Sequence, residues 1–441
     1  MKKYEIIYEK YRNDILEGFL INGQQLPSIR QSCQLFKASQ TTVEHAYEKL
    51  MMEGYITSKP QIGFYVSIDQ ERIKLHQQID HYSYEHQSIS YIYDFRSQTV
   101  SQDSFEVSVW KRYLKDVLDD ITKLTTYGDS QGEYVLREAL CQYAYKVRGV
   151  LCHPDQILVG SNYQALLFIL CGLLPHKTVI GMEYQENTQT KRVFESYGFQ
   201  VIMLKSFDDG IDIEDMKRAP LDILYLNSAS QGLKKKPLSA KLRKQLLEYT
   251  KKENILIIED DYNGELSYHS REHYAMQGFA FNDNVIYCGS FSRLLLPSLR
   301  ISYMVLNQQY LRIYQKHKNE YGPTASKLEQ LAFSQYIVDG YLYKHLKKLK
   351  KDYKEKNQMM LKTLKKYFPF SYYLEEAYLR YHIELVDIDE TRLMQICQNH
   401  QIAINPIQNH QLLLSFASLP LSEIDEAIQK LYQIINESRI V

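Results

Sequence analysis

The sequence predicts an α/β fold in which a winged helix-turn-helix precedes a larger domain built on a mainly parallel sheet. Within the first 66 residues, helical spacing of apolar side chains gives way to two short strand-like runs. Further along, helical segments alternate with β-branched runs such as QILVG, TVIGME and NILIIEDDY. Such alternation predicts parallel strands with helices on both faces of the sheet.

Bulk properties limit the classes of protein to consider. At 441 residues the chain is too long for one core, so two or three domains are expected. The 53 basic and 53 acidic side chains cancel, so no global field drives binding to nucleic acid or membrane. No long apolar run or signal-peptide core occurs, so we expect a cytoplasmic protein without a membrane partner. The six scattered cysteines indicate reduced, buried thiols and no metal site.

Residues 1–67 are the first predicted domain. Its expected elements are three helices and a two-stranded hairpin, at residues 4–18, from near Ser28, from about 40 to 53, and at 55–57 and 63–66. Pro27 fits the first turn of the second helix, and Gly54 ends the third. Residues 68–93, rich in His, Gln and Ser, are expected to be a linker.

The stretches LPSIR and SQTTVEHAYEKLMMEGYI resemble the DNA-binding domain of GntR-type bacterial regulators. The resemblance implies a recognition helix whose N-terminal residues face the bases of the major groove. By position, the residues facing DNA would be Arg30, Ser39, Gln40, Thr41, Thr42, His45 and Lys59. The family usually has Arg where Gln40 stands and a basic, Gly-rich wing where residues 58–61 stand.

The charge of this domain is low for a DNA-binding domain. Residues 1–66 hold eight Lys or Arg against seven Asp or Glu, a net charge of +1. Because phosphate neutralisation dominates affinity, one such domain should bind double-stranded DNA weakly, and a dimer is needed. The alternative is that the domain has become a protein-interaction module.

The rest of the chain resembles the fold-type I aminotransferases that use pyridoxal phosphate. The resemblance is carried by TYGDSQGEYVLREAL, RGVLCHPDQILVGSNYQALL, NILIIEDDYNGEL and VIYCGSFSRLLLPSLRISYMV. Joined to the N-terminal domain, these motifs match the MocR-type subfamily of GntR regulators. The match implies a three-layer αβα large domain over residues 94–320, a small C-terminal α+β subdomain over 321–441, and a head-to-tail homodimer.

The resemblance also implies the residues of a cofactor site. Asp260 would hold the pyridine nitrogen, Tyr262 the ring hydroxyl, and Ser290, Ser292 and Arg300 the phosphate. Ser161 and Asn162 would lie beside the phosphate at the start of a helix.

The residues that perform the family's reaction are missing. Arg293 stands where the lysine that joins the cofactor aldehyde is expected, and no lysine occurs from residue 285 to 308. A guanidinium stays protonated and cannot make that Schiff base. No arginine between residues 392 and 439 is left to bind a substrate carboxylate.

Further departures surround this position. Asn162, Ser228 and Ser230 replace the family's Gly, Pro and His, and Glu186 stands where an aromatic residue contacts the ring. Covalent pyridoxal phosphate is therefore not expected. Three states of the pocket remain open: non-covalent pyridoxal or pyridoxamine phosphate, a different phosphorylated ligand with Arg293 as an added contact, or an empty remnant.

The sequence thus predicts a DNA-binding transcriptional regulator whose aminotransferase-like domain is catalytically inactive and serves dimerisation and effector sensing. One alternative is a pyridoxal-phosphate-dependent aminotransferase with an accessory DNA-binding domain. Another is a regulator that acts through protein contacts. The basic segment 344–366 is either a solvated helix face at the dimer interface or a second contact to the DNA backbone.

Overall fold

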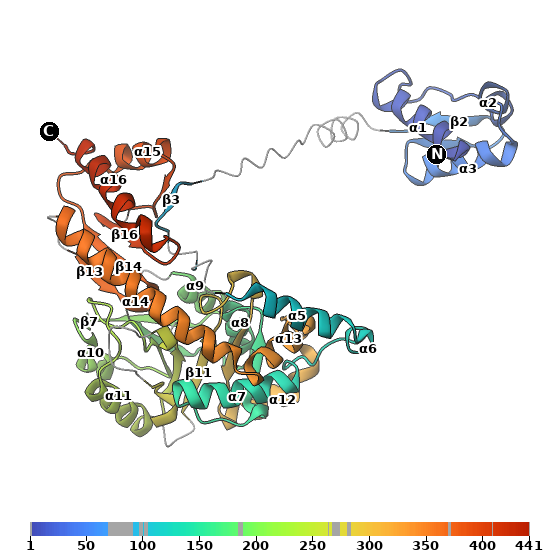
Figure 1. Ribbon diagram of the computed structural model, residues 1–441. Coiled ribbons are helices and arrows are strands. Elements are labelled where there is room, and N and C mark those ends of the chain that lie inside the picture. Colours follow the sequence, from blue (N-terminus) through green and yellow to red (C-terminus); the bar gives the residue numbers. More distant parts are fainter. Residues whose placement is uncertain are drawn as a thin grey trace. The chain divides into compact units, whose positions relative to one another are not determined.

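The computed structural model forms two compact units, residues 1–89 and 90–441 (Figure 1). The residues that it describes are 2–68, 91–96, 100, 105–183, 188–262, 264–266, 274–279, 284–368, 372–407 and 409–440. Most of the expected linker and Glu186 lie outside the described residues. Tyr93, at the end of that linker, already belongs to a strand of the second unit.

The N-terminal unit contains the three helices and the hairpin that the sequence predicts. The elements are α1 (Lys3–Leu16), α2 (Ile29–Phe36), α3 (Gln40–Met52), β1 (Ile56–Lys59) and β2 (Gly63–Val66), with the two strands antiparallel. A buried hydroxyl chain links the helices: Ser32 Oγ lies 2.8 Å from the hydroxyl of Tyr11 and 2.9 Å from that of Tyr47. The Tyr47 hydroxyl in turn donates to the carbonyl of Pro27 at 2.6 Å.

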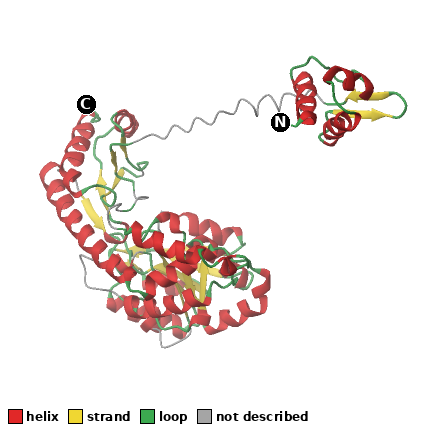
Figure 2. Cartoon of the chain, turned by 45° about the vertical axis from the view of Figure 1, so that its right-hand side comes forward, coloured by secondary structure: helices red, strands yellow, loops and turns green. Residues whose placement is uncertain are grey.

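A seven-stranded sheet forms the centre of the second unit, with helices on both of its faces (Figure 2). Its strands, in spatial order, are β4 (Ile157–Gly160), β12 (Ser302–Val305), β11 (Val285–Ser290), β10 (Leu256–Asp260), β9 (Ile223–Asn227), β5 (Val179–Glu183) and β6 (Gln200–Leu204). Strand β12 is antiparallel to both neighbours and the other pairs are parallel. The predicted mainly parallel sheet is therefore confirmed.

Alternation along the strands divides the core in two. On β11, Tyr287 faces one apolar cluster, and Ile286 and Cys288 face the other. Helices α8 (Tyr163–Leu173), α9 (Thr188–Ser196) and α12 (Gln308–His317) pack on the Cys288 side, and α7 (Tyr134–Arg148) and α11 (Ala240–Lys252) pack on the opposite side. Strands buried on both faces need continuous apolar runs, and such runs are what the sequence shows.

The remaining elements flank this sheet or form the C-terminal part. They are β3 (Tyr93–Asp94), α5 (Val107–Leu118), α6 (Ile121–Leu124), β7 (Ser206–Phe207), β8 (Gly210–Ile211), α10 (Ile213–Arg218), α13 (Lys327–Val338), α14 (Tyr341–Tyr367), β13 (Tyr372–Glu375), β14 (Arg380–Glu384), α15 (Glu390–Asn399), β15 (Ile402–Ala403), β16 (Gln411–Ser415) and α16 (Ile424–Glu437). Strands β13, β14 and β16 make an antiparallel sheet, and β3 pairs with β15. The domain boundaries at residues 67, 93 and 320 stay predictions.

Two other sequence expectations can be compared with the structure. The basic segment 344–366 lies within α14, where Leu346, Leu349 and Tyr353 are buried. Of the six free cysteines, Cys171, Cys288 and Cys397 are buried and the other three are only half-buried, so the expectation of buried thiols holds for half of them. Across the described residues, no helix has the length and apolar character needed to span a membrane.

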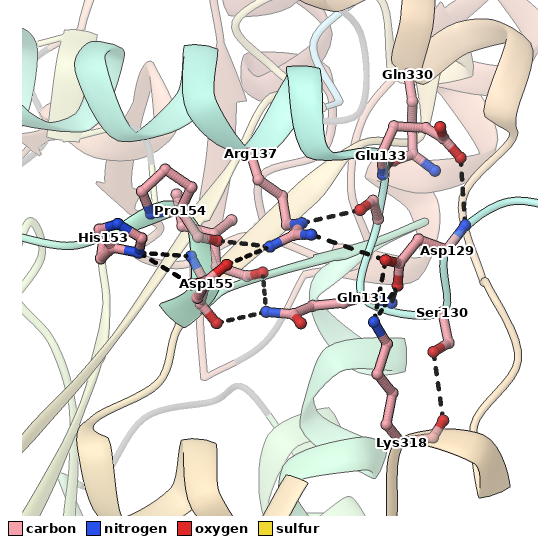
Figure 3. Close-up of polar contacts among 12 residues, drawn as sticks. Asp129, Ser130, Gln131, Glu133, Arg137, His153, Pro154, Asp155, Lys318 and Gln330 are labelled. Carbon is pink, nitrogen blue, oxygen red and sulfur yellow. Dashed lines mark hydrogen bonds and ion pairs between the residues drawn. The ribbon is translucent and has the colours of Figure 1, made fainter. Parts of the chain in front are cut away.

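A polar network fixes the segment that carries the motif TYGDSQGEYVLREAL (Figure 3). Arg137 on α7 donates to the carbonyls of Gly132 and Pro154, both at 2.9 Å, and it lies within ion-pair distance of Asp129 and Asp155. Lys318 also pairs with Asp129, at 2.8 Å. The polar residues of this motif therefore anchor α7 to neighbouring loops.

A buried ion pair ties α7 to the end of β10. Arg148 donates to both carboxylate oxygens of Asp261, at 2.6 and 3.0 Å, and to the carbonyl of Gly264 at 3.0 Å. The hydroxyl of Tyr287 donates to the same carboxylate at 2.8 Å. Because all these groups are buried, removal of one of them would leave its partners without one of their hydrogen bonds in the interior.

We predict that R148M lowers the free energy of unfolding of the second unit by about 3 to 5 kcal/mol, because Asp261 is left charged and buried. The single tryptophan, Trp110, lies in this unit on α5 and reports its urea denaturation. The double variant R148M/D261L removes both charges and is expected to recover most of the loss. An R148M midpoint equal to the wild-type value would contradict this account.

Candidate functional site

Side-chain caps define the start of both helices of the helix-turn-helix. Ser28 Oγ accepts from the backbone N–H of Gln31 at 3.3 Å, while Gln31 Oε1 accepts from the N–H of Ser28 at 2.8 Å. Ser39 Oγ likewise accepts from the N–H of Thr42, at 3.3 Å, at the start of α3. These caps satisfy N–H groups that a helix end would otherwise leave free, and so they fix where α3 begins.

The structure brings the predicted DNA-facing residues to the surface of one small unit. Six of them are exposed and Thr42 is half-buried. Ser39 and Thr42 are engaged with each other, with their hydroxyls 2.7 Å apart. These two residues therefore shape the helix start, whereas Gln40 and Thr41 are exposed on its first turn.

Contacts that the sequence analysis did not identify orient several of these residues. Gln40 Nε2 donates to Glu44 Oε1 at 2.8 Å, and the ring of His45 packs edge-on against Tyr4 with centroids 4.5 Å apart. The i, i+4 spacing of Gln40 and Glu44 was a signal available in the sequence. Glu44 also adds a negative charge beside the first turn of α3, which is consistent with the low net charge of the domain.

The tip of the hairpin is held by long-range contacts. Gln25 Nε2 donates to the carbonyl of Ile62 at 2.8 Å, and the ammonium of Lys59 lies 4.5 Å from the centroid of the Tyr65 ring. Gln61 adopts a positive φ of 61°, a conformation that such a tight turn requires. Lys59 is thus exposed on an ordered wing.

In the second unit, the predicted cofactor residues gather at one edge of the sheet. Asn227, Asp260 and Ser290 end the parallel strands β9, β10 and β11. The register places Asp260 opposite Asn227 on one side and Cys288 on the other. Because the carboxyl ends of parallel strands share one edge, this edge is where α/β proteins place their ligand sites.

A row of serines continues along the same edge. Ser302 on β12 pairs in register with Ser290 and with Gly160, and its hydroxyl lies 3.0 Å from that of Ser290. The hydroxyls of Ser290 and Ser292 are 3.3 Å apart. The sequence analysis missed Ser302, which is fully buried. Antiparallel pairing across β12 brought it there, and no linear motif indicates that pairing.

The start of α8 lies beside this row. Asn162 caps the helix, and its Oδ1 accepts from the N–H of Ala165 at 2.8 Å. The backbone N–H of Ser161 donates to Thr324 Oγ1 at 3.2 Å. Part of the hydrogen-bonding capacity that a phosphate would use at this helix start is therefore satisfied internally. Arg300 is exposed and adopts a positive φ of 47°, two residues before Ser302.

Asp260 is half-buried on the α8 side of the sheet and is hydrogen-bonded by a tyrosine of the next strand. Tyr225 donates its hydroxyl to Asp260 Oδ2 at 2.6 Å. Burial raises the pKa of Asp260 to about 6, the Tyr225 hydrogen bond acts in the opposite direction, and the charge of Asp261 adds to the increase. Near neutral pH this carboxylate is therefore poised to gain from a positively charged partner.

Tyr262 and Arg293 are both engaged by the C-terminal part. The rings of Tyr262 and Tyr378 lie 4.9 Å apart, and Arg293 Nη1 donates to the carbonyl of Tyr378 at 3.0 Å. The Arg293 guanidinium carbon lies 6.0 Å from the centre of the Tyr262 ring. Arg293 is only 7% exposed. Tyr378 belongs to no motif recognised in the sequence, and it reaches this position only through tertiary packing.

A buried charge cluster joins the same two parts. Glu375 on β13 accepts from Arg380 Nε at 2.6 Å and from Ser230 Oγ at 2.8 Å, and its other contact is His382 Nε2 at 2.7 Å. Burial opposes ionisation, but the His382 hydrogen bond and the charge of Arg380 together lower the pKa of Glu375 to about 2. Ser230 stands where the family's His is expected, and here it serves this carboxylate.

The fit of these residues to pyridoxal phosphate is partial. Asp260, Tyr262 and the serine row supply the ring and phosphate partners at one sheet edge. At the position expected for the amine, the structure has a buried guanidinium held by a backbone carbonyl. The set therefore does not fit a covalently bound cofactor.

We predict that D260N stabilises the second unit at pH 7 by up to about 3 kcal/mol, since each pKa unit corresponds to about 1.4 kcal/mol. The folded pKa, about 6, lies above the ordinary value of 3.8, so wild-type stability should fall as the pH rises from about 4 to about 6. D260N lacks this fall, and the two proteins should be equally stable near pH 3. Urea denaturation followed by Trp110 fluorescence across this range measures the difference. A constant offset at every pH would contradict the raised pKa.

Family comparisons agree with this division of the chain. Residues 3–66 match the bacterial regulatory proteins of the gntR family, and residues 93–431 match the aminotransferases of class I and II. The fold of the second unit is similar to a kynurenine aminotransferase from Pyrococcus horikoshii, with a TM-score of 0.69 and 21% identity over 85% of this chain and 96% of that one. At this identity the likeness shows the fold alone.

Full-length relatives are named as regulators. The HTH-type transcriptional regulator YdeL of Bacillus subtilis (strain 168) is 30% identical over 97% of this chain and 96% of its own length. The probable rhizopine catabolism regulatory protein MocR of Rhizobium meliloti is 27% identical over 80% of this chain and 76% of its own. The chain therefore belongs to the MocR-type subfamily of GntR transcriptional regulators, in which a GntR helix-turn-helix is fused to a class I and II aminotransferase-like domain.

Proposed function

We propose that this regulator is a cytoplasmic homodimer that binds an operator, and that its aminotransferase-like domain is catalytically inactive and senses a small phosphorylated ligand without a covalent bond. The observation that carries the proposal is Arg293. It occupies the expected lysine position, it is buried, and its guanidinium is bound to the carbonyl of Tyr378.

Loss of the amine removes the family's chemistry. A lysine can lose its proton in a buried site and attack a carbonyl, whereas arginine remains protonated with its lone pairs delocalised. The segment from residue 285 to 308 offers no lysine in its place, and no arginine follows Arg392 before Arg439 to hold a substrate carboxylate. Both the covalent anchor and the substrate clamp are therefore absent.

The retained residues support a ligand-binding role. Ser290, Ser292 and Arg300 would provide the phosphate contacts, and Asp260 would gain from a cationic ring nitrogen. The partial internal capping at Asn162 predicts weak, reversible binding. In this proposal the ligand acts as an effector, and no bond to it is made or broken.

DNA binding is assigned to the N-terminal unit and dimerisation to the second. Gln40, Thr41 and His45 would face the bases, and Arg30 and Lys59 the phosphates. A net charge of +1 makes one such unit a weak binder, so two units reading two half-sites would supply the affinity. The exposed lysines of α14 remain candidates for a dimer interface or an added backbone contact.

We predict that the full-length protein binds DNA from its own promoter region as a dimer, in a salt-dependent manner. R30A and K59A should weaken specific and non-specific complexes alike and lower the salt slope by about one per domain, because each removes a phosphate contact. Q40A should weaken the specific complex selectively. K10A, which removes a positive charge from α1 of the same unit, is the matched control. Titrations by fluorescence anisotropy measure these effects, and failure to bind at low salt would reject the proposed DNA-binding role.

We predict that borohydride treatment of the wild-type protein with pyridoxal phosphate gives no stoichiometric adduct at a single site, because Arg293 forms no reducible bond. R293K is expected to gain the mass of one phosphopyridoxyl group if the ring and phosphate contacts are retained. R293Q, which supplies no amine, is the control. A stoichiometric wild-type adduct mapped to one lysine would restore the enzyme alternative.

A further inference from the structure

The second unit has a cavity whose lining includes none of the strand-end site residues. Its volume is about 710 Å³, which is within the usual range for small-molecule sites. It lies between the loop 234–237 and the C-terminal elements α14, β13 and β14. The lining residues are Lys234, Lys235, Lys236, Pro237, Asn357, Leu361, Tyr372, Tyr373, Leu374, Glu376 and Tyr381.

Aromatic side chains form a large part of the wall, and contacts with one another and with neighbouring residues hold them in place. Tyr381 is buried and donates its hydroxyl to Asn357 Oδ1 at 2.8 Å. Tyr372 packs edge-on against Tyr381, with centroids 6.1 Å apart. Tyr373 stacks on His382 at 4.5 Å with the ring planes only 11° apart. Positioned rings of this kind offer apolar area at little entropic cost to a ligand.

The opposite wall carries three consecutive lysines. Lys234 is paired with Asp208. For Lys235 and Lys236, no ion pair occurs among the described residues, and Glu376 is the one acidic residue in the lining. Solvated lysines are common on surfaces, but these two line a cavity with tyrosines on its other side. The cavity therefore has unneutralised positive charge.

The backbone of the lysine loop is fixed. Gln231 and Lys236 exchange two backbone hydrogen bonds, at 2.6 and 2.9 Å. The N–H of Gly232 donates to the buried carboxylate of Glu183 at 2.6 Å. Lys235 adopts a positive φ of 50°, which is uncommon for a residue with a side chain. The loop thus presents its cations from a defined position.

We propose that this cavity binds a small amphipathic anion, whose flat apolar body lies on the tyrosines and whose carboxylate or phosphate group pairs with Lys235 and Lys236. An apolar ligand would leave the lysines unpaired, and a small inorganic anion would leave the aromatic wall unused. A molecule with both parts satisfies both walls. Lysine ammonium groups can pair with either anionic group because they act as point charges.

Contacts lead from this cavity to the strand-end site. Tyr373 stacks on His382, His382 contacts Glu375 at 2.7 Å, and Glu375 accepts from Ser230 at 2.8 Å. A ligand that shifts Tyr373 would therefore act on the loop that follows β9. That regulatory consequence rests on the proposed function, whereas the binding itself does not.

Isothermal titration of the full-length protein with matched probes tests the binding. The probes are naphthylacetate, naphthyl phosphate, the neutral naphthylacetamide and acetate. We expect saturable binding of one or both naphthyl anions, binding of the amide about tenfold weaker, and no measurable binding of acetate. Comparison of the carboxylate with the phosphate shows which anionic group the site prefers.

Variants locate the binding. K235Q/K236Q should weaken binding of the preferred anion about five- to tenfold and leave the amide unchanged, since two partly exposed ion pairs are removed. K241Q/K244Q removes the same charge from α11 outside the cavity and should match the wild type. L361W, which fills the cavity without altering its charge, should abolish binding of both naphthyl anions.

The proposal is overturned if neither naphthyl anion binds saturably, if the amide binds as tightly as the anions, or if the lysine and Leu361 variants bind like the wild type. DNA titrations with and without the preferred anion form a separate arm. Binding of the anion without a change in DNA affinity would preserve the site and reject its regulatory link. Loss of DNA binding by the unliganded protein would instead reject the proposed function.

Discussion

The buried pair between Arg148 and Asp261 positions the strand end on which the candidate site depends. Asp260 and Asp261 are consecutive, and alternation along the chain sends their side chains to opposite faces of the sheet. Asp261 faces α7, where Arg148 binds both of its carboxylate oxygens. Because Asp261 is fixed, the backbone of its neighbours Asp260 and Tyr262 is fixed as well. The charges of this cluster also influence its neighbours. Burial, followed by the charge of Asp261, raises the pKa of Glu259 and of Glu265 to about 7.

The framework of the site is supported independently of the residue at position 293. The position of Asp260 depends on the sheet and on the pair behind it, and neither depends on the residue at position 293. Under the proposed function, an arginine at position 293 would prevent the reaction without disturbing the fold. The strand ends, the serine row and the capped start of α8 are assembled at one edge.

The C-terminal part is attached to the same edge through polar contacts. Arg293 binds the carbonyl of Tyr378, Tyr262 packs against the Tyr378 ring, and Ser230 donates to Glu375. Arg293, Tyr262 and Ser230 thus serve to join two parts of the fold. A ligand in the strand-end site would either change these contacts or have to fit beside them. Binding there and the packing of the C-terminal part are therefore physically linked.

The sequence alone determined the elements and the kind of protein. Apolar periodicity placed the helix-turn-helix and the hairpin, because local caps such as Ser28, Ser39 and Gly54 define those ends within a few residues of chain. Continuous β-branched runs predicted the parallel sheet, since strands covered on both faces have no polar side. Asp260 and Ser290 were identified through the family resemblance, and both end parallel strands at one edge of the sheet. The absence of lysine from residues 285–308 is likewise read directly from the sequence.

Only the tertiary structure decided which side chains meet at the site. Ser302 joins the serine row through an antiparallel pairing between distant segments, and Tyr378 reaches Tyr262 from more than a hundred residues away. The partners of Arg293, Asp260 and Ser230 are Tyr378, Tyr225 and Glu375, and none of them belongs to a motif. The cavity at Lys235 and Lys236 combines the loop 234–237 with strands of the C-terminal part. Contacts of this kind depend on how elements pack across the fold, and local patterns in a sequence carry no record of that packing.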